Sequence, residues 1–86
     1  MAKRLEKGFV RIILKEMSVD GNEMFYDSPV MRYENAFDTL SKYKECFDSD
    51  SMFDMLLVSG AHTWLPVSLI KSAIYLPESF LGEINE

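Results

Sequence analysis

Apolar and polar side chains alternate with a period of two in the first part of the chain. Between residues 8 and 18, Val10, Ile12 and Leu14 share one side of an extended backbone, and the side chains between them share the other. This period, together with the β-branched content, predicts a strand over 8–18. Its two faces are expected to meet different surroundings, with Val10, Ile12 and Leu14 in the core.

A tight turn at 19–22 follows this strand. Gly21 stands there between an aspartate and an asparagine, and these residue types adopt the positive φ angles that hairpin turns need. The returning strand covers 23–27, and Pro29 marks its end because proline cannot donate to a strand ladder. The sequence thus predicts an antiparallel hairpin.

The period changes to that of a helix over 35–47. Asn35 is suited to the N-cap position, and Asp38 in the first turn interacts favourably with the helix dipole. The apolar stripe of this helix has three- and four-residue spacing and consists of Phe37, Leu40, Tyr43 and Phe47. The run Asp-Ser-Asp-Ser at 48–51 favours a turn, which ends the helix.

The second half of the chain is typical of short strands. Gly60 marks a turn, and Pro66 interrupts the strand that follows it. The predicted elements are a strand over 53–59, a turn at 60–61, a strand over 63–65, a 3₁₀-like turn at 67–68, a last strand over 69–76 and a tail from 77. Strands joined by tight turns pair antiparallel, since parallel pairs need long crossovers.

Together these elements predict an α+β fold with about five short strands and one helix at about 35–47. A small, strongly bent antiparallel sheet or a small barrel would bury the apolar faces, with the helix over one opening. The side chains expected in the core are Val10, Ile12, Leu14, Phe37, Leu40, Leu57, Trp64, Ile70 and Ile74.

One segment of the second half carries a family resemblance. Residues 60–70 combine a turn glycine, the sequence Trp64-Leu65-Pro66 at a strand end, a 3₁₀ turn and an apolar last strand. This segment resembles the closing hairpin of SH3-like barrels, which implies that the last strand closes a small barrel. The acidic-aromatic loop motif of peptide-binding SH3 domains is missing, and those domains have no helix at the place of 35–47. The resemblance therefore implies a topology and not the binding of proline-rich peptides.

Length and composition fit a single domain. The chain has 86 residues, so we expect one domain over 1–86, with 77–86 as a short C-terminal tail or helical turn. Apolar residues make up 48%, which argues against disorder, and one cysteine cannot form an internal disulfide. The apolar runs are far shorter than the ~20 residues that cross a bilayer, and no apolar run follows Lys3 and Arg4 as in a signal peptide. These features predict a cytoplasmic location and no membrane partner.

The charge is unevenly distributed. The net charge is −5, but residues 1–16 carry +3 (five basic and two acidic) and residues 17–86 carry −8 (four basic and twelve acidic). A protein that binds duplex nucleic acid needs clustered lysine and arginine to displace counterions, and most of this surface would repel phosphate. We therefore expect no duplex partner.

Catalysis has little support in the residue types present. Cys46, the only cysteine, lies beside the apolar stripe of the helix, and His62, the only histidine, lies in the predicted turn. A Cys–His pair would require the helix end to touch that hairpin. The sequence has no glycine-rich phosphate loop and no carboxylate pair in an aromatic-lined context. We expect no enzymatic activity and no cofactor.

Three aspartates imitate the start of a calcium loop, namely Asp48, Asp50 and Asp54. Met52 occupies the next ligand position, Phe53 replaces the turn glycine, and no glutamate closes the loop. One cysteine and one histidine do not complete a zinc site. The sequence predicts a solvated acidic loop and no metal site.

The predicted function is therefore binding rather than catalysis. Small acidic chains without catalytic residues resemble bacteriophage inhibitors that modulate a host protein, and we expect a partner protein with a basic surface. The candidate contact residues are Asp20, Glu23, Phe25 and Asp27 around the first hairpin, and Asp48, Asp50 and Asp54 after the helix.

Two alternatives remain open. Phe9, Arg11 and Lys15 share one face of the first strand, and a small barrel could use such a basic-aromatic face to bind single-stranded nucleic acid. The chain could also be a homo-oligomeric structural or assembly protein that covers its sheet edges with copies of itself.

Overall fold

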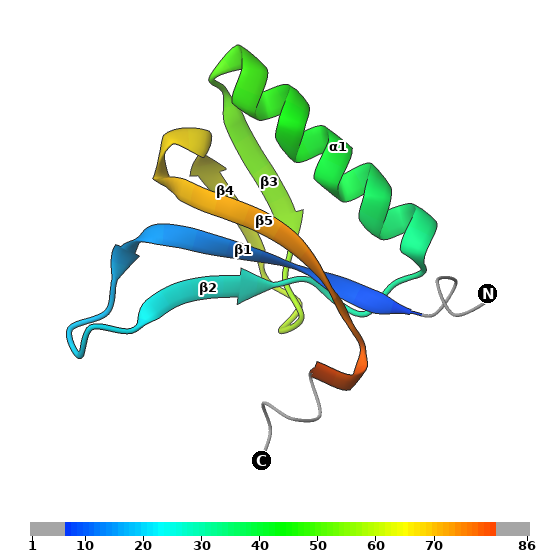
Figure 1. Cartoon of the computed structure of the whole chain (residues 1–86). Coiled ribbons are helices and arrows are strands. Elements are labelled where there is room, and N and C mark those ends of the chain that lie inside the picture. Colours follow the sequence, from blue (N-terminus) through cyan, green and yellow to red (C-terminus); the bar gives the residue numbers. More distant parts are fainter. Residues whose placement is uncertain (1–6, 81–86) are drawn as a thin grey trace.

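The structure is a computed structural model and describes residues 7–80. Figure 1 shows the elements in chain order: β1 (Gly8–Met17), β2 (Glu23–Asp27), α1 (Tyr33–Ser49), β3 (Met52–Leu56), β4 (His62–Pro66), the 3₁₀ helix η2 (Val67–Leu69) and β5 (Ile70–Pro77). The predicted α+β class is confirmed, and β2 has the predicted bounds. The third strand is shorter than predicted and ends at Leu56, because residues 57–61 form the turn to β4.

The strands form two antiparallel sheets. One has the order β2-β1-β5 and the other consists of β3 and β4. In the first sheet, β1 lies between its neighbours, pairing Ile13 with Phe25 of β2 and Gly8 with Pro77 of β5. The sheets are not closed into a barrel by ladders among the described residues. Figure 1 shows α1 running beside β3 and β5, on the side of the molecule away from β2.

The helix begins earlier than the sequence pattern indicates. Arg32 is the N-cap residue, its carbonyl accepts the first helical hydrogen bond from Ala36 N–H (3.0 Å), and no side chain caps this end. The prediction of Asn35 as N-cap was wrong. The Tyr33 ring packs edge-on against Tyr75, with 5.5 Å between centroids, which favours the additional turn. At the other end Asp50 adopts the left-handed conformation and caps the helix, so α1 extends past the predicted 47.

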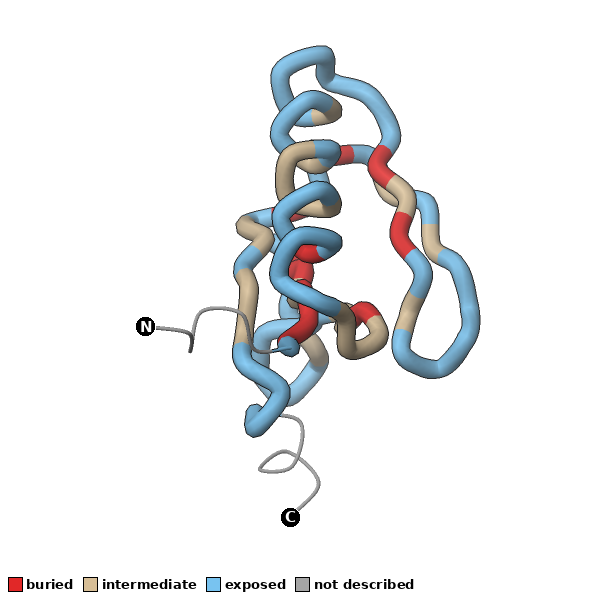
Figure 2. The backbone as a smooth tube through the Cα atoms, turned by 90° about the vertical axis from the view of Figure 1, so that its right-hand side faces the viewer, coloured by how far each residue is buried: buried red, intermediate tan, exposed pale blue. Residues whose placement is uncertain are grey.

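The core lies between the helix and the inward faces of both sheets. Figure 2 shows the buried segments on the strands behind α1, while most of the helix surface is exposed. The buried members of the core are Val10, Ile12, Leu14, Ala36, Phe53, Met55, Val67 and Ile70. Leu40, Tyr43, Leu57 and Leu65 are partly buried and pack against them. The alternation in residues 8–18 thus correctly predicted the inward face of β1.

Three residues expected in the core are exposed. Phe37 follows Ala36 on the helix and lies at the border of the buried stripe, which runs through Ala36, Leu40 and Tyr43. Trp64 is 65% exposed because Thr63 and Leu65, not Trp64, face inward on β4. Ile74 pairs with Arg11 on the outer face of the three-stranded sheet. Each was correctly placed in its element but assigned to the wrong face.

The closing segment has the predicted local order. β4 ends at Pro66, η2 follows, and β5 then pairs with β1. Kinship with SH3-like barrels stays a prediction. The predicted tail begins at Pro77, the last residue of β5, and its apolar residues Leu81 and Ile84 lie outside the described residues.

Candidate functional site

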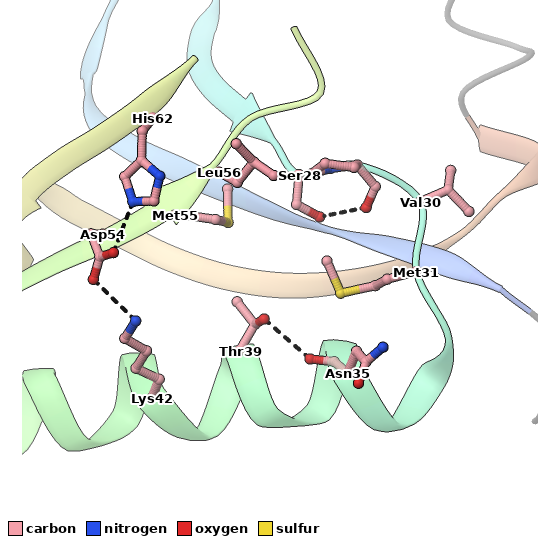
Figure 3. Close-up of a pocket in the computed structure, with 11 residues that line it drawn as sticks. Ser28, Val30, Met31, Asn35, Thr39, Lys42, Asp54, Met55, Leu56 and His62 are labelled. Carbon is pink, nitrogen blue, oxygen red and sulfur yellow. Dashed lines mark hydrogen bonds and ion pairs between the residues drawn. The ribbon is translucent and has the colours of Figure 1, made fainter. Parts of the chain in front are cut away.

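A cleft of about 390 Å³ separates β3 from α1 (Figure 3). The segment between β2 and α1 forms one wall, the outer edge of β3 another, and the first half of the helix the floor. The lining residues are Ser28, Pro29, Val30, Met31, Asn35, Thr39, Lys42, Asp54, Met55, Leu56 and His62. The β2–α1 segment, α1, β3 and, through His62, β4 therefore meet at one concave surface.

Asp54 joins two basic side chains at one end of this cleft. Its Oδ1 lies 3.1 Å from Lys42 Nζ of the helix, and its Oδ2 accepts a hydrogen bond from His62 Nε2 of β4 at 2.8 Å. The hydrogen bond from His62, followed by that from Lys42, lowers the pKa of Asp54 below its ordinary value of 3.8. At neutral pH the carboxylate is ionised, and its charge is balanced locally.

Apolar side chains and a short polar row complete the lining. The apolar lining consists of Pro29, Val30, Met31, Met55 and Leu56. Asn35 and Thr39 lie one turn apart on α1, where Thr39 Oγ1 donates to the Asn35 carbonyl at 3.1 Å. The cleft thus combines an apolar wall with a polar row on the helix and the Lys42–Asp54–His62 group at one end.

The backbone of β3 presents unpaired groups to this cleft. Leu57 N–H donates to the Ala61 carbonyl (2.7 Å), and Val67 N–H donates to the Ser51 carbonyl (3.3 Å). Both bonds belong to ladder positions with odd residue numbers at the ends of β3. Bonded and non-bonded pairs alternate in an antiparallel ladder, so the pairs Asp54–Trp64 and Leu56–His62 are non-bonded. The N–H and C=O groups of Asp54 and Leu56 therefore point away from β4. Within residues 7–80, these groups have no hydrogen-bond partner.

The first-hairpin candidates are largely paired with cations. Asp27 accepts two hydrogen bonds from Arg11, at 2.7 and 3.0 Å, and both side chains are mostly buried. Glu23 forms an ion pair with Lys71 of β5. Asp20 lies in the exposed turn, where a hydrogen bond from the Ser18 hydroxyl, and then one from the backbone of Asn22, lower its pKa below 3.8.

The acidic candidates after the helix do not gather. Asp48 pairs with Lys44 one turn earlier on α1, at 3.3 Å, and Asp50 caps the helix. Asp54 faces the cleft instead. In the part of the chain that the structure describes, no three histidine, cysteine or acidic side chains come together to hold a metal ion.

The basic-aromatic face of β1 is closed by its own contacts. Phe9 is completely buried, so its ring is not available to stack on a base. The Arg11 guanidinium is held by Asp27 and lies 3.9 Å from the centroid of the Phe25 ring. Lys15 is exposed near the end of β1. Phe9 and Arg11 therefore serve the packing of the outer sheet face.

The two residues considered for covalent chemistry have separate partners. Cys46 Sγ donates to the Met52 carbonyl at 3.3 Å, whereas His62 is bound to Asp54.

No helix within residues 7–80 has the length and apolar character that a membrane crossing requires.

Sequence reasoning did not select Lys42, and it considered His62 only as a possible partner of Cys46. The predicted turn at 60–61 would have paired Ser59 with His62, so it gave no signal for this contact. The observed turn over 57–61 instead places Leu56 opposite His62, which makes Asp54 the diagonal neighbour of His62 on the same sheet face. The approach of Lys42 depends on how the helix packs, which the local pattern does not specify.

No family model, curated protein or solved structure matches this chain.

Proposed function

We propose that the chain acts by binding another protein, and that the cleft between β3 and α1 receives an extended segment of that partner. The observation that supports this proposal is the unpaired backbone of Asp54 and Leu56 along the cleft. A strand edge next to a groove is the arrangement that proteins use to bind a peptide as an added strand.

The cleft offers both parts of such recognition. The backbone groups of β3 supply main-chain hydrogen bonds, which are independent of the partner's sequence. Side chains on one face of the added strand would then pack on Met31 and Leu56. Those near Lys42 and His62 would meet a lysine ammonium group and an imidazole ring, which favours a polar side chain there.

The distribution of charge favours a partner with a basic surface. Away from the cleft, whose own charges are balanced, the described surface keeps acidic side chains without an ion pair, such as Asp20 in the first turn and Asp50 at the end of α1. A basic surface around the bound segment would therefore be attracted at long range. More specifically, we propose that the chain is an inhibitor whose cleft binds a functional segment of a host protein.

A selection from a displayed library of random heptapeptides tests the proposal. Peptides enriched on the immobilised chain should shift the backbone amide signals of Asp54, Leu56 and Thr39 in NMR titrations. Leu56→Asp should weaken their binding at least about tenfold, because it places a charge on the apolar wall.

Leu69→Asp is the matched control. Leu69 and Leu56 are both 48% exposed, but Leu69 lies on η2 and does not line the cleft. Peptides that bind equally well to both variants, or that shift signals only outside the cleft, would contradict the proposal. So would the absence of any enriched peptide.

A further inference from the structure

The open edge of β3 determines how an added strand would lie. The N–H and C=O groups of Asp54 and Leu56 point to this edge, whereas those of Met55 point to β4. The edge faces the helix, because the Met52 carbonyl on it accepts a hydrogen bond from Cys46 Sγ of α1 at 3.3 Å. In antiparallel addition, one partner residue therefore bonds to Asp54, and the residue two positions before it bonds to Leu56.

The pleat of the sheet sends three successive partner side chains in two directions. Side chains at opposed positions of neighbouring strands lie on the same face of a sheet. The partner side chains opposite Asp54 and Leu56 therefore lie on the face that carries those two side chains and His62. The side chain between them points with Met55, which is only 5% exposed, toward the helix and Thr39 on the cleft floor (Figure 3). Met55 and Leu56 are apolar, which favours apolar partner residues opposite both.

The position opposite Asp54 offers both donors and acceptors of hydrogen bonds. Lys42 Nζ has three donors and directs one of them to Asp54 Oδ1. His62 Nε2 donates to Asp54 Oδ2, so Nδ1 is an acceptor while the ring is neutral. Each Asp54 oxygen keeps a lone pair beyond these contacts. A partner side chain that both donates and accepts matches this position.

The charges of the same three side chains sum to zero while His62 is neutral. Lys42 is cationic, and the lowered pKa of Asp54 keeps its carboxylate ionised. A charged partner side chain would therefore add one charge without a counter-charge next to a strand edge that the partner has covered. A carboxamide adds no charge. Its NH₂ group can donate to Asp54, and its oxygen can accept from Lys42.

We propose that the partner segment contains the tripeptide apolar–apolar–amide, with glutamine or asparagine opposite Asp54 and the two apolar residues opposite Leu56 and Met55. The segment runs antiparallel to β3, because Asp54 and Leu56 then each exchange two hydrogen bonds with a single partner residue. This proposal rests on the proposed function, since it specifies the segment that the cleft binds.

Isothermal titration calorimetry with three capped heptapeptides tests this proposal. Their sequence is Gly-Thr-Ile-Leu-X-Thr-Gly, with glutamine, glutamate or lysine at X. The titrations are done at about pH 8, where an imidazole is normally neutral. The glutamine peptide should bind at least about threefold more tightly than either charged peptide. Replacing its leucine with serine should weaken binding at least about tenfold, because the apolar contact beside Met55 is lost.

Two variants of the chain should change this preference in opposite directions. Lys42→Met leaves the Asp54 carboxylate without its ammonium partner, so the lysine peptide should become the tightest of the three. Asp54→Asn leaves Lys42 without its counter-charge, so the glutamate peptide should become the tightest. Each affinity ratio should shift at least about threefold. Both changed side chains are partly exposed, and circular dichroism checks that the fold persists.

Lys44→Met and Asp48→Asn are the matched controls. Lys44 and Asp48 form an ion pair of 3.3 Å on α1 and do not line the cleft. The two controls change the net charge of the chain by the same amounts as the cleft variants, so they should leave the order of the three peptides unchanged. If they reorder the peptides as the cleft variants do, the preference reflects overall charge and the proposal is wrong.

The proposal is also overturned if a charged peptide binds the wild type most tightly, or if none of the three binds at up to about 1 mM. The same holds if both cleft variants keep the wild-type order, or if the reversed sequence Gln-Leu-Ile binds more tightly than Ile-Leu-Gln. The proposed function is decided separately by the random heptapeptides. Random peptides that bind in the cleft without this tripeptide would support that function and contradict the motif.

Discussion

Arg11 and Asp27 face each other across the β1–β2 ladder and are joined by two parallel hydrogen bonds of 2.7 and 3.0 Å. Phe25 lies against the guanidinium, with 3.9 Å from the Arg11 Cζ atom to the ring centroid. Little of either charged side chain is exposed, with 15% for Arg11 and 11% for Asp27. The pair therefore fixes the register of the hairpin through a fork-shaped contact that a lysine could not reproduce.

Removing one partner of this pair should destabilise the chain more than removing both. Asp27→Ala leaves a mostly buried guanidinium uncompensated and should lower the free energy of unfolding by about 2 kcal/mol or more. The double variant Arg11→Met, Asp27→Leu should be closer to the wild type, because no buried charge remains. Urea unfolding of the three proteins measures the difference. Equal losses in the single and double variants would contradict this account.

The orientation of α1 predicts that truncating Leu40 lowers the free energy of unfolding more than truncating the larger Phe37. Leu40 packs against the buried core, whereas Phe37 is exposed. Leu40→Ala should therefore cost about 2 kcal/mol or more, and Phe37→Ala about 0.5 kcal/mol or less. Thermal unfolding measures both changes. The reverse order would mean that the helix is rotated from the position described.

Ser28 should be the most sensitive serine among the described residues. Its side chain is completely buried, and its Oγ accepts the hydrogen bond of Val10 N–H at 2.9 Å. Ser28→Ala would leave that buried N–H without an acceptor and should cost about 1–3 kcal/mol. Ser68 is exposed on η2, and Ser68→Ala serves as the control, with an expected change within about 0.5 kcal/mol. Similar effects of the two changes would disprove the role given to Ser28.

The Asp54 group should contribute stability that depends on pH. The pKa of Asp54 is lowered below 3.8 in the folded chain, so its contribution is fully present at pH values above 3.8 and is lost as the pH falls through the folded value. Asp54→Asn should therefore destabilise the chain at pH 7 by about 0.5–1 kcal/mol, because the group is partly exposed. The gap should narrow as the pH falls below 3.8. A gap that persists at low pH would show that the charge of Asp54 is not responsible.

The elements were predictable where the local pattern is strong. The alternation in residues 8–18 placed β1 and identified its inward face, and Gly21 and Gly60 have the positive φ values, 87° and 96°, that their turns require. The start of the helix was misplaced because Asn35 is a better N-cap residue than Arg32, and the contact of Tyr33 with Tyr75 outweighs that preference.

The candidate site was only partly predictable. Asp54 was selected for its charge, but its neighbours Lys42 and His62 come from a helix and from a second strand. The face of Trp64 was wrong because alternation in a five-residue strand does not say which face the rest of the chain covers. Both the neighbours of Asp54 and the exposure of Trp64 depend on how the elements pack against each other.

The central position of β1 has a consequence for how the chain folds during synthesis. Its ladder with β2 joins residues that are close in sequence, but its ladder with β5 joins Gly8 to Pro77, near the two limits of the described chain. Contacts between such distant residues form slowly, and this one has to wait until the ribosome has released residues 70–77. During that interval the edge of β1 is open to other chains, because β5, which protects it, is made after the other described strands.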